Sequence, residues 1–279
     1  MDRLKAFIFI LLFITGVSYG FCIDQEEKAF AFDWLNLELE ISGTGDIIPL
    51  DHGNVFQWQY DATLKAQTDL LKNFIASMGV LRLDAYNFAR DILMREPEKN
   101  EMIYNYMKNI KKQTIKYTDH RVIIKTRLPL VGKNGLVRFL ITAGTDTGTF
   151  PLYDEYIYST PFTGLVIDAR GLGIIPAIGP RIFDEAHQAI YSIDQVDKEY
   201  FEKWGAVLYT YDPYYKGFED RVGENPYRIV ALENDKLIPT DIAISDEDAK
   251  VLLQNDISKQ NLIECRVIII LDTVLQNGF

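Results

Sequence analysis

The segment from Gly164 to Tyr191 constrains the fold of this chain more than any other. It reads GLVIDARGLGIIPAIGPRIFDEAHQAIY, an apolar run that leads into two close glycines and then into a hydrophobic connection interrupted by Pro176 and Pro180. Glycine tolerates positive φ, whereas proline fixes φ and cannot continue a helix or a central strand. The segment therefore predicts a strand, a rigid turn and a second strand.

The chain has 279 residues, 48% of them hydrophobic, which is enough to build the cores of one large or two ordinary domains. Its formal net charge is -11 at pH 7. Binders of nucleic acid or of anionic membranes need clustered Lys and Arg to neutralise phosphate. The composition therefore argues against both classes and favours proteins as partners.

Residues 1–20 have the three zones of an export signal. Arg3 and Lys5 precede an apolar run, and the small residues Ser18 and Gly20 follow it. The run is shorter than the roughly 20 residues that a membrane span needs, which argues against a retained anchor. We expect cleavage after Gly20 and a periplasmic protein, with association to the outer membrane left open.

Cys22 and Cys265 are the only two cysteines. Lipidation of Cys22 stays open, although the bulky Tyr19 and Phe21 depart from a lipoprotein signal, and membrane attachment would depend on it. In an oxidising compartment the two thiols could instead form a disulfide. The other interpretation of Cys265 is a small buried hydrophobe in a strand.

Residues 21–131 alternate between strand and helix patterns. Apolar residues recur at every second position from Leu35 to Ser42, which predicts a half-buried strand. The following residues Gly43, Gly45 and Pro49 are expected to end it. Residues 61–78 repeat at three and four positions, which predicts an amphipathic helix. Residues 114–118 and 121–130, joined by Asp119 and His120, predict a hairpin. Together they indicate an α+β domain.

Residues 132–150 are expected to form a linker, with a further strand near residues 136–143. Residues 151–279 predict a second α+β domain that contains the Gly164 segment, strands near 227–232 and 240–244, and a helix capped by Ser245. The apolar run at 266–271 indicates a strand buried on both faces. We therefore predict two α+β domains, each a small, mainly antiparallel sheet packed with helices.

The charged residues of the Gly164 segment are candidates for a site. Asp168 and Arg170 would point to the same side of a strand, so they could pair across the Gly171 and Gly173 turn or could contact a partner or ligand. We favour a buried pair that holds the turn, because buried charges are normally paired. Arg181, with Asp184 and Glu185, is expected to form a solvated acidic and basic face.

A dense group of tyrosines, Tyr209, Tyr211, Tyr214 and Tyr215, falls in a predicted loop. Tyrosine is enriched at the hot spots of protein interfaces, so these residues are candidates for a protein contact. The alternative is that they cover the edge of the second domain's sheet.

Motifs of catalysis are absent from the sequence. The three histidines, His52, His120 and His187, lie far apart without metal-ligand spacing. The glycines at 171 and 173 lack the third glycine and helix of a dinucleotide fingerprint, and no phosphate loop or HExxH sequence occurs. We therefore expect no catalytic residue, no cofactor and no metal.

The chain also resembles known envelope proteins. The segment Ala62 to Ala66 with Leu70 and Leu71, continuing to Pro129 and Leu130, is similar to the strand, helix and hairpin domain of a bacterial envelope lipoprotein family that includes the flagellar basal-disk protein. The second half resembles a module often fused to that domain in exported proteins. The residues that carry this second resemblance are Gly164 to Gly173, Asn225 and Pro226, Ile244 to Ala249, and Cys265 to Ile269.

The resemblance implies a non-enzymatic subunit or adaptor of a cell-envelope assembly, such as a ring, disk or collar of the flagellar motor. Its partners would be envelope or motor proteins, or further copies of itself. The alternative is a periplasmic or surface binding module for a ligand or an extracellular partner, with Arg170 and Arg181 as anion contacts.

Overall fold

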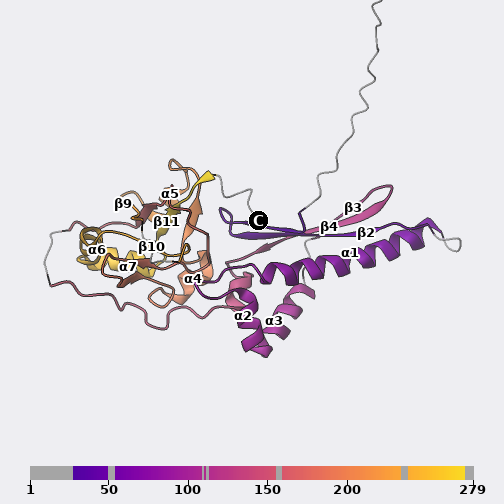
Figure 1. Cartoon of the computed structure of the whole chain (residues 1–279), viewed down its shortest axis with the longest axis horizontal. Coiled ribbons are helices and arrows are strands. Elements are labelled where there is room, and N and C mark those ends of the chain that lie inside the picture. The colour runs from indigo at the N-terminus through magenta and orange to yellow at the C-terminus, as the bar shows by residue number, and fades with distance from the viewer. Residues whose placement is uncertain are drawn as a thin grey trace, which may run out of the picture.

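The computed structural model describes residues 28–49, 54–108, 110, 113–154, 159–233 and 238–273. Two units lie side by side along the long axis of the molecule (Figure 1). The N-terminal unit contains strands β1 to β4 and helices α1 to α3, and the C-terminal unit contains the later strands and helices. The predicted export signal and Cys22 lie outside the described residues.

A four-stranded antiparallel sheet forms the base of the N-terminal unit. The strand order is β1-β2-β4-β3, with β1 at Phe30–Asp33, β2 at Glu38–Asp46, β3 at Gln113–Tyr117 and β4 at Arg121–Pro129. The predicted hairpin is confirmed, since β3 pairs with β4 across a turn in which the amide of Thr118 donates to the carbonyl of Arg121 at 2.9 Å.

Helix α1, Val55–Met78, packs along β2 and begins where the Asn54 side chain accepts a hydrogen bond from the amide of Gln57. Its buried stripe includes Ala62, Ala66 and Leu70, which confirms the predicted periodicity. Gly43 and Gly45 do not end β2 as expected. They lie within the strand, where the absence of side chains lets the backbone of α1 approach the backbone of β2 directly.

Two shorter helices complete the N-terminal unit. Helix α2 spans Ala89–Arg95 and helix α3 spans Pro97–Lys108. At the start of α2, the Asp91 carboxylate accepts a hydrogen bond from the amide of Phe88 at 2.8 Å. Pro97 begins α3, a position where its missing amide hydrogen costs nothing. The two helices therefore form a helical hairpin beside α1.

The linker predicted at residues 132–150 does not contain the expected strand. Leu136–Phe139 form a 3-10 helix, η1, and Leu136, Val137, Leu140 and Ala143 are buried. These side chains belong to the main hydrophobic cluster. A short buried apolar run has the same composition in a strand and in a helix, so its sequence does not distinguish the two conformations.

The C-terminal unit contains a four-stranded sheet in the order β8-β11-β5-β9. Its strands are β5 at Leu165–Asp168, β8 at Leu208–Thr210, β9 at Tyr227–Val230 and β11 at Val267–Ile270. The α+β class is confirmed, but the expectation of an antiparallel sheet in this unit is wrong, because all three pairings are parallel. Parallel strands buried on both faces explain the unbroken apolar runs of β5 and β11.

A smaller sheet and four helices surround this parallel sheet. The smaller sheet has the order β10-β6-β7, with β6 at Ile182–Phe183, β7 at Ala189–Tyr191 and β10 at Ile242–Ala243. The helices are α4 at Lys198–Trp204, α5 at Phe218–Val222, α6 at Asp246–Leu253 and α7 at Asp256–Ile263. Ser245 caps α6 as predicted, its hydroxyl accepting from the amide of Asp248.

The two units share one hydrophobic core, since buried residues of both belong to a single cluster. Backbone hydrogen bonds also join them, from the amide of Ile178 to the carbonyl of Arg82 at 3.1 Å and from the amide of Gly179 to the carbonyl of Leu83 at 2.8 Å. On the other side of the junction, the rings of Trp34 and Tyr209 pack edge to face at 5.8 Å. The orientation of the N-terminal unit relative to the C-terminal unit therefore rests on packing and on main-chain bonds.

Candidate functional site

The first group of predicted site residues gathers where the parallel strands β5 and β11 end. Arg170 donates to both carboxylate oxygens of Asp168, from Nε at 2.8 Å and from Nη2 at 2.5 Å. The pairing expected from the sequence is therefore present, but it is not buried, since the side chains are 46% and 27% exposed. The bond from Arg170 lowers the pKa of Asp168 below its ordinary value of 3.8.

Asp272, which sequence reasoning missed, completes this end of the sheet. Its carboxylate accepts a hydrogen bond from the amide of Gly171 at 2.9 Å, which ties the turn after β5 to the residue that follows β11. Gly171 and Gly173 have φ of 85° and 63°, and a β carbon on either would meet open space. The glycines thus serve the backbone conformation of the turn and not a close packing contact.

The four candidate tyrosines lie in different environments. Tyr209 belongs to β8 and is buried, with its hydroxyl donating to the carbonyl of Ala177 at 2.9 Å, so it cannot form the expected contact surface. Tyr211 is half-buried. Tyr215 packs edge to face on Phe218 at 5.9 Å. Tyr214 is 86% exposed and is the tyrosine of this group that a partner could reach.

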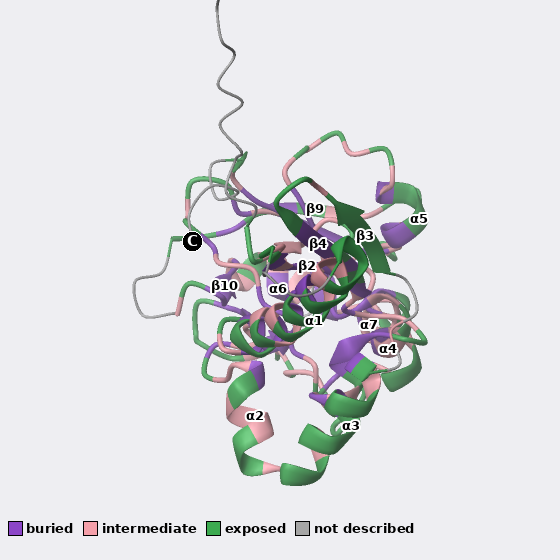
Figure 2. Ribbon diagram, turned by 90° about the vertical axis from the view of Figure 1, so that its right-hand side faces the viewer, coloured by how far each residue is buried: buried purple, intermediate pink, exposed green. Residues whose placement is uncertain are grey.

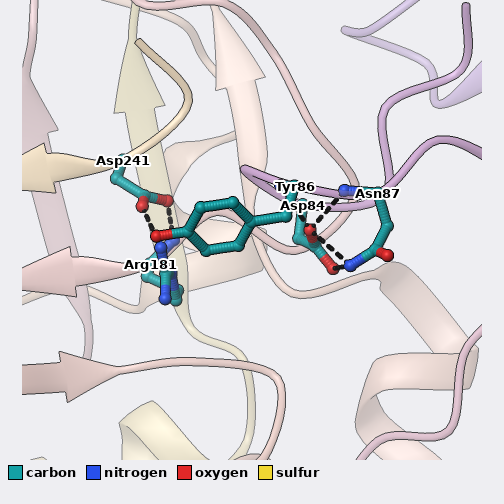
Figure 3. Close-up of polar contacts among 5 residues, drawn as sticks. All are labelled: Asp84, Tyr86, Asn87, Arg181 and Asp241. Carbon is teal, nitrogen blue, oxygen red and sulfur yellow. Dashed lines mark hydrogen bonds and ion pairs between the residues drawn. The ribbon is translucent and has the colours of Figure 1, made fainter. Parts of the chain in front are cut away.

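Arg181 lies at the junction of the two units instead of on a solvated face. Its Nη2 donates to the carboxylate of Asp241 at 2.5 Å, and Asp241 is buried (Figure 3). The guanidinium lies 5.0 Å from the ring centroids of both Tyr86 and Phe183. The interpretation that grouped Arg181 with Asp184 and Glu185 is therefore corrected.

Tyr86 is held in this position by a turn of the N-terminal unit. The carboxylate of Asp84 accepts hydrogen bonds from the amides of Tyr86 at 2.7 Å and Asn87 at 2.8 Å, and from the side-chain amide of Asn87 (Figure 3). An Asp followed three residues later by Asn was a detectable turn signal in the sequence. Its partner Arg181 could not be identified locally, because it lies in the other unit.

Asp184 and Glu185 have partners of their own. The buried carboxylate of Asp184 accepts from the hydroxyl of Tyr153 at 2.8 Å and from the amide of Gln188 at 2.7 Å. Burial and this carboxylate together raise the pKa of Tyr153. Glu185 and Asp246 exchange bonds between backbone amide and carboxylate at 2.9 and 3.1 Å. The bonds between Glu185 and Asp246 fix the start of α6, and the carboxylate that pairs with Arg181 is that of Asp241.

Cys265 is buried, and burial raises the pKa of its thiol to about 12. The predicted disulfide or lipidation involves Cys22, which lies outside the described part of the chain, so both stay predictions.

Near Cys265 lies Arg221, a buried cation that sequence reasoning missed. It donates to the carbonyls of Trp204 at 2.7 Å and Gly205 at 2.8 Å, and burial lowers its pKa to about 10. Arg221 thus caps the C-terminal end of α4, where positive charge is favoured.

The described residues offer little for metal or small-molecule chemistry. Among them, no group of three or more His, Cys, Asp or Glu side chains lies close enough to hold a metal ion. A shallow hollow of about 370 Å³ lies beside α1, lined by Thr44, Leu64, Lys65, Thr68, Asp69 and Lys72. In this hollow, the Asp69 carboxylate already accepts a hydrogen bond from the amide of Thr44 at 2.9 Å.

None of the helices in the described ranges is both long and apolar enough to span a membrane.

Comparison with known proteins supports part of the resemblance. Residues 164–273 match the family model of the second domain of Treponema pallidum Tp0624, a bacterial protein of the spirochetes. The match begins at Gly164, directly before β5, and includes every strand of the parallel sheet. A search of curated proteins finds no match. The similarity of the N-terminal unit to envelope lipoproteins stays a prediction.

Proposed function

We propose that this protein is a non-enzymatic structural or adaptor subunit of a bacterial cell-envelope assembly, and that it works by binding other proteins through its N-terminal unit. The observation that supports the proposal is that exposed apolar side chains are concentrated on the N-terminal unit. Among the described residues, most of the large hydrophobic side chains that are exposed belong to the N-terminal unit. Exposed apolar surface of this kind marks interaction sites on soluble proteins.

Helix α1 presents much of this surface. Phe56, Tyr60 and Leu64 follow one another at intervals of four residues, and they are 78%, 64% and 44% exposed. Residues four apart lie on one face of a helix. In these first turns of α1 they lie on the other side of the helix from Ala62 and Ala66, which α1 buries on the sheet, so this part of the helix has one face in the core and an apolar face available to a partner.

The junction described above supports an adaptor role. Arg181, Asp241 and Tyr86 fix the N-terminal unit to the C-terminal unit, together with the main-chain bonds at Arg82 and Leu83. An adaptor that connects two components of an assembly must keep its N-terminal and C-terminal units in a fixed orientation relative to each other. A shared core with polar bonds at its margin provides that constraint.

Export to the periplasm and a place in the flagellar motor belong to the proposal as well. They rest on the signal-like residues 1–20 and on the resemblance of the N-terminal unit to a family that includes the flagellar basal-disk protein. Attachment to the outer membrane would depend on lipidation of Cys22. The acidic C-terminal unit would then face the aqueous periplasm.

The test is crosslinking in cells followed by capture of the full chain. Replacement of Phe56 and Tyr60 by Ser should remove the captured envelope proteins and leave the thermal unfolding midpoint unchanged. Leu152→Ser, at a 92% exposed position beside the C-terminal unit, is the matched control and should capture them as the wild type does. Equal capture by the Phe56 and Tyr60 variant would contradict the proposal.

The flagellar assignment has its own test. Electron cryo-tomography of motors in cells that lack the protein should show the loss of a defined periplasmic density, with impaired swimming. Intact motors and normal swimming would refute the flagellar assignment, while the wider proposal of an envelope adaptor would still depend on the capture experiment.

A second candidate is a ligand-binding module. Ligands of open parallel sheets bind beyond the carboxyl ends of the strands, which is where Arg170 lies with its side chain 46% exposed. Arg181, the other expected anion contact, is engaged by Asp241. This function predicts a saturable thermal shift with a carboxylate or glycan ligand that Arg170→Gln abolishes, and its absence would exclude the anion site.

A further inference from the structure

Strand β3 is an open edge of the N-terminal sheet. All five of its residues, Gln113–Tyr117, are exposed (Figure 2). It pairs with β4 on one side only, and on its other side none of the described strands adjoins it. An edge strand carries unpaired amide and carbonyl groups, which form a template for another strand.

The part of β2 that extends beyond the edge strand β1 is protected. There two side chains of α1 cover the side of β2 that β1 does not reach. Asp69 accepts from the amide of Thr44 at 2.9 Å, and Asn73 donates to the carbonyl of Ser42 at 2.8 Å. The fold thus satisfies polar groups of this exposed part of β2 with dedicated side chains. No comparable contact covers β3 among the described residues.

The hairpin geometry decides which groups of β3 point outward. Thr118 and Arg121 form the bonded pair next to the turn, and bonded pairs alternate along an antiparallel ladder. Thr114 and Lys116 therefore direct their amide and carbonyl groups toward β4. Gln113, Ile115 and Tyr117 direct theirs away from the sheet, which leaves three donors and three acceptors along the edge.

We propose that β3 pairs antiparallel with β3 of a second copy of this chain, about a two-fold axis through Ile115. This inference rests on the proposed function and names its interface between copies. In this register Ile115 exchanges two hydrogen bonds with Ile115 of the second copy, and Gln113 of each copy exchanges two with Tyr117 of the other. All the outward groups of both strands are then satisfied, and the two sheets become one continuous sheet.

The side chains suit this register. Gln113, Ile115 and Tyr117 lie on the face of the sheet that α1 covers, because they pair with Thr126, Ile124 and Val122. Ile115, which is 43% exposed, would pack against Ile115 of the second copy. On the other face Thr114 would lie opposite Lys116. The register therefore places no two like charges opposite each other.

Charge favours a second copy in this antiparallel orientation. Residues 151–279 contain 22 Asp and Glu against 11 Lys and Arg, whereas residues 28–150 contain 14 against 16. The strands of the N-terminal sheet run along the long axis, with the acidic C-terminal unit at one end (Figure 1). Antiparallel pairing places the two acidic units at opposite ends of the dimer, and it brings together the two units that are nearly neutral.

A charge-exchange experiment at Ile115 tests the inference. Analytical ultracentrifugation of the full mature chain should show a dimer for the wild type. Ile115→Lys and Ile115→Glu each place like charges at the two-fold axis, so each should weaken dimerisation by about tenfold or more. An equimolar mixture of the two variants should restore the dimer, because only the mixed pair has opposite charges at this position. Leu152→Lys, the control, should dimerise as the wild type does.

A monomeric wild type, or charge variants that dimerise like the wild type, would overturn the inference. Failure of the mixture to restore the dimer would overturn the register. Ile115→Pro gives a second measurement, because it removes an amide that points away from β4 and should abolish the dimer while the far-ultraviolet circular dichroism is unchanged. If the wild type is monomeric but still captures envelope proteins, the proposed function stands and this inference fails.

Discussion

A β carbon on Gly45 would overlap the carbonyl oxygen of Ala62, because α1 lies with its backbone directly on β2. Gly43 has the same relationship to the carbonyl oxygen of Ala66. The two alanines are four residues apart, about one turn of helix, and the two glycines are two residues apart on the strand, with Thr44 between them. The small residues thus form a matched pair of contacts that sets the distance between the helix and the sheet.

Gly45→Ala should therefore lower the free energy of unfolding by about 1–3 kcal/mol, the usual cost of forcing extra volume into a packed site. Urea unfolding followed by circular dichroism measures the change. Thr44→Ala is the matched control on the same strand, since the bond from the Thr44 amide to Asp69 survives that substitution. Equal stability of the Gly45 variant and the control would mean that α1 can move away from β2 without cost.

The pair of Arg181 and Asp241 at the unit junction should be strongly coupled. Arg181→Met leaves the buried carboxylate of Asp241 without its cation, which typically costs about 3–5 kcal/mol. The double variant Arg181→Met with Asp241→Leu removes both charges and should be less destabilised than Arg181→Met alone. Equilibrium unfolding of the two single variants and the double variant gives the coupling, and simple additivity would contradict it.

Tyr86 contributes to the same junction through its ring. Tyr86→Phe retains the ring against the Arg181 guanidinium, and since Tyr86 is 69% exposed it should change the free energy of unfolding by less than about 0.5 kcal/mol. Tyr86→Ala removes the ring and should cost more. The same unfolding measurement orders the two variants, and a Phe variant as unstable as the Ala variant would show that the ring contributes nothing.

The ion pair of Asp168 and Arg170 predicts a pH dependence. The pKa of Asp168 is lowered because the ionised carboxylate accepts bonds from Arg170. A lowered carboxyl pKa adds stability above the ordinary value of 3.8, and that stability is lost as pH falls through the lowered pKa. The difference in unfolding free energy between wild type and Asp168→Asn should be constant near neutral pH and should shrink below about pH 4. Arg170→Gln should lose the same pH dependence.

Local patterns predicted the elements whose partners are close in sequence. The four-residue spacing of Ala62, Ala66 and Leu70 identified α1, and the two-residue turn at Asp119 and His120 identified the hairpin of β3 and β4. Both signals arise within a single element or between neighbours, where periodicity and turn chemistry are visible.

Relationships between distant segments were not visible in the sequence. Leu165 pairs with Val267, and Arg181 binds Asp241 60 residues further along the chain. No local rule connects such residues, so the parallel sheet and the junction were missed. The same limit applies to Gly43 and Gly45, because the helix that requires them to lack side chains follows later in the chain.

The exposed tyrosine of the β8 loop can be separated from its buried neighbour by mutation. Tyr215 packs on Phe218, and it lies against the cluster of Val166, Val222 and Ile268. Tyr215→Ala should therefore lower the unfolding midpoint, at a cost of up to about 3–5 kcal/mol for a fully buried aromatic ring and less for this half-buried one.

Tyr214→Ala should leave the unfolding midpoint unchanged, because the side chain is 86% exposed. If the loop contacts a partner, this single variant should reduce the capture of envelope proteins, whereas the earlier candidate Tyr215 would confound any such assay through loss of stability. Differential scanning calorimetry read beside capture separates the two effects. A Tyr214 variant that is stable and captures partners at the wild-type level would remove this loop from the interface and leave α1 and β3 as the contact surface.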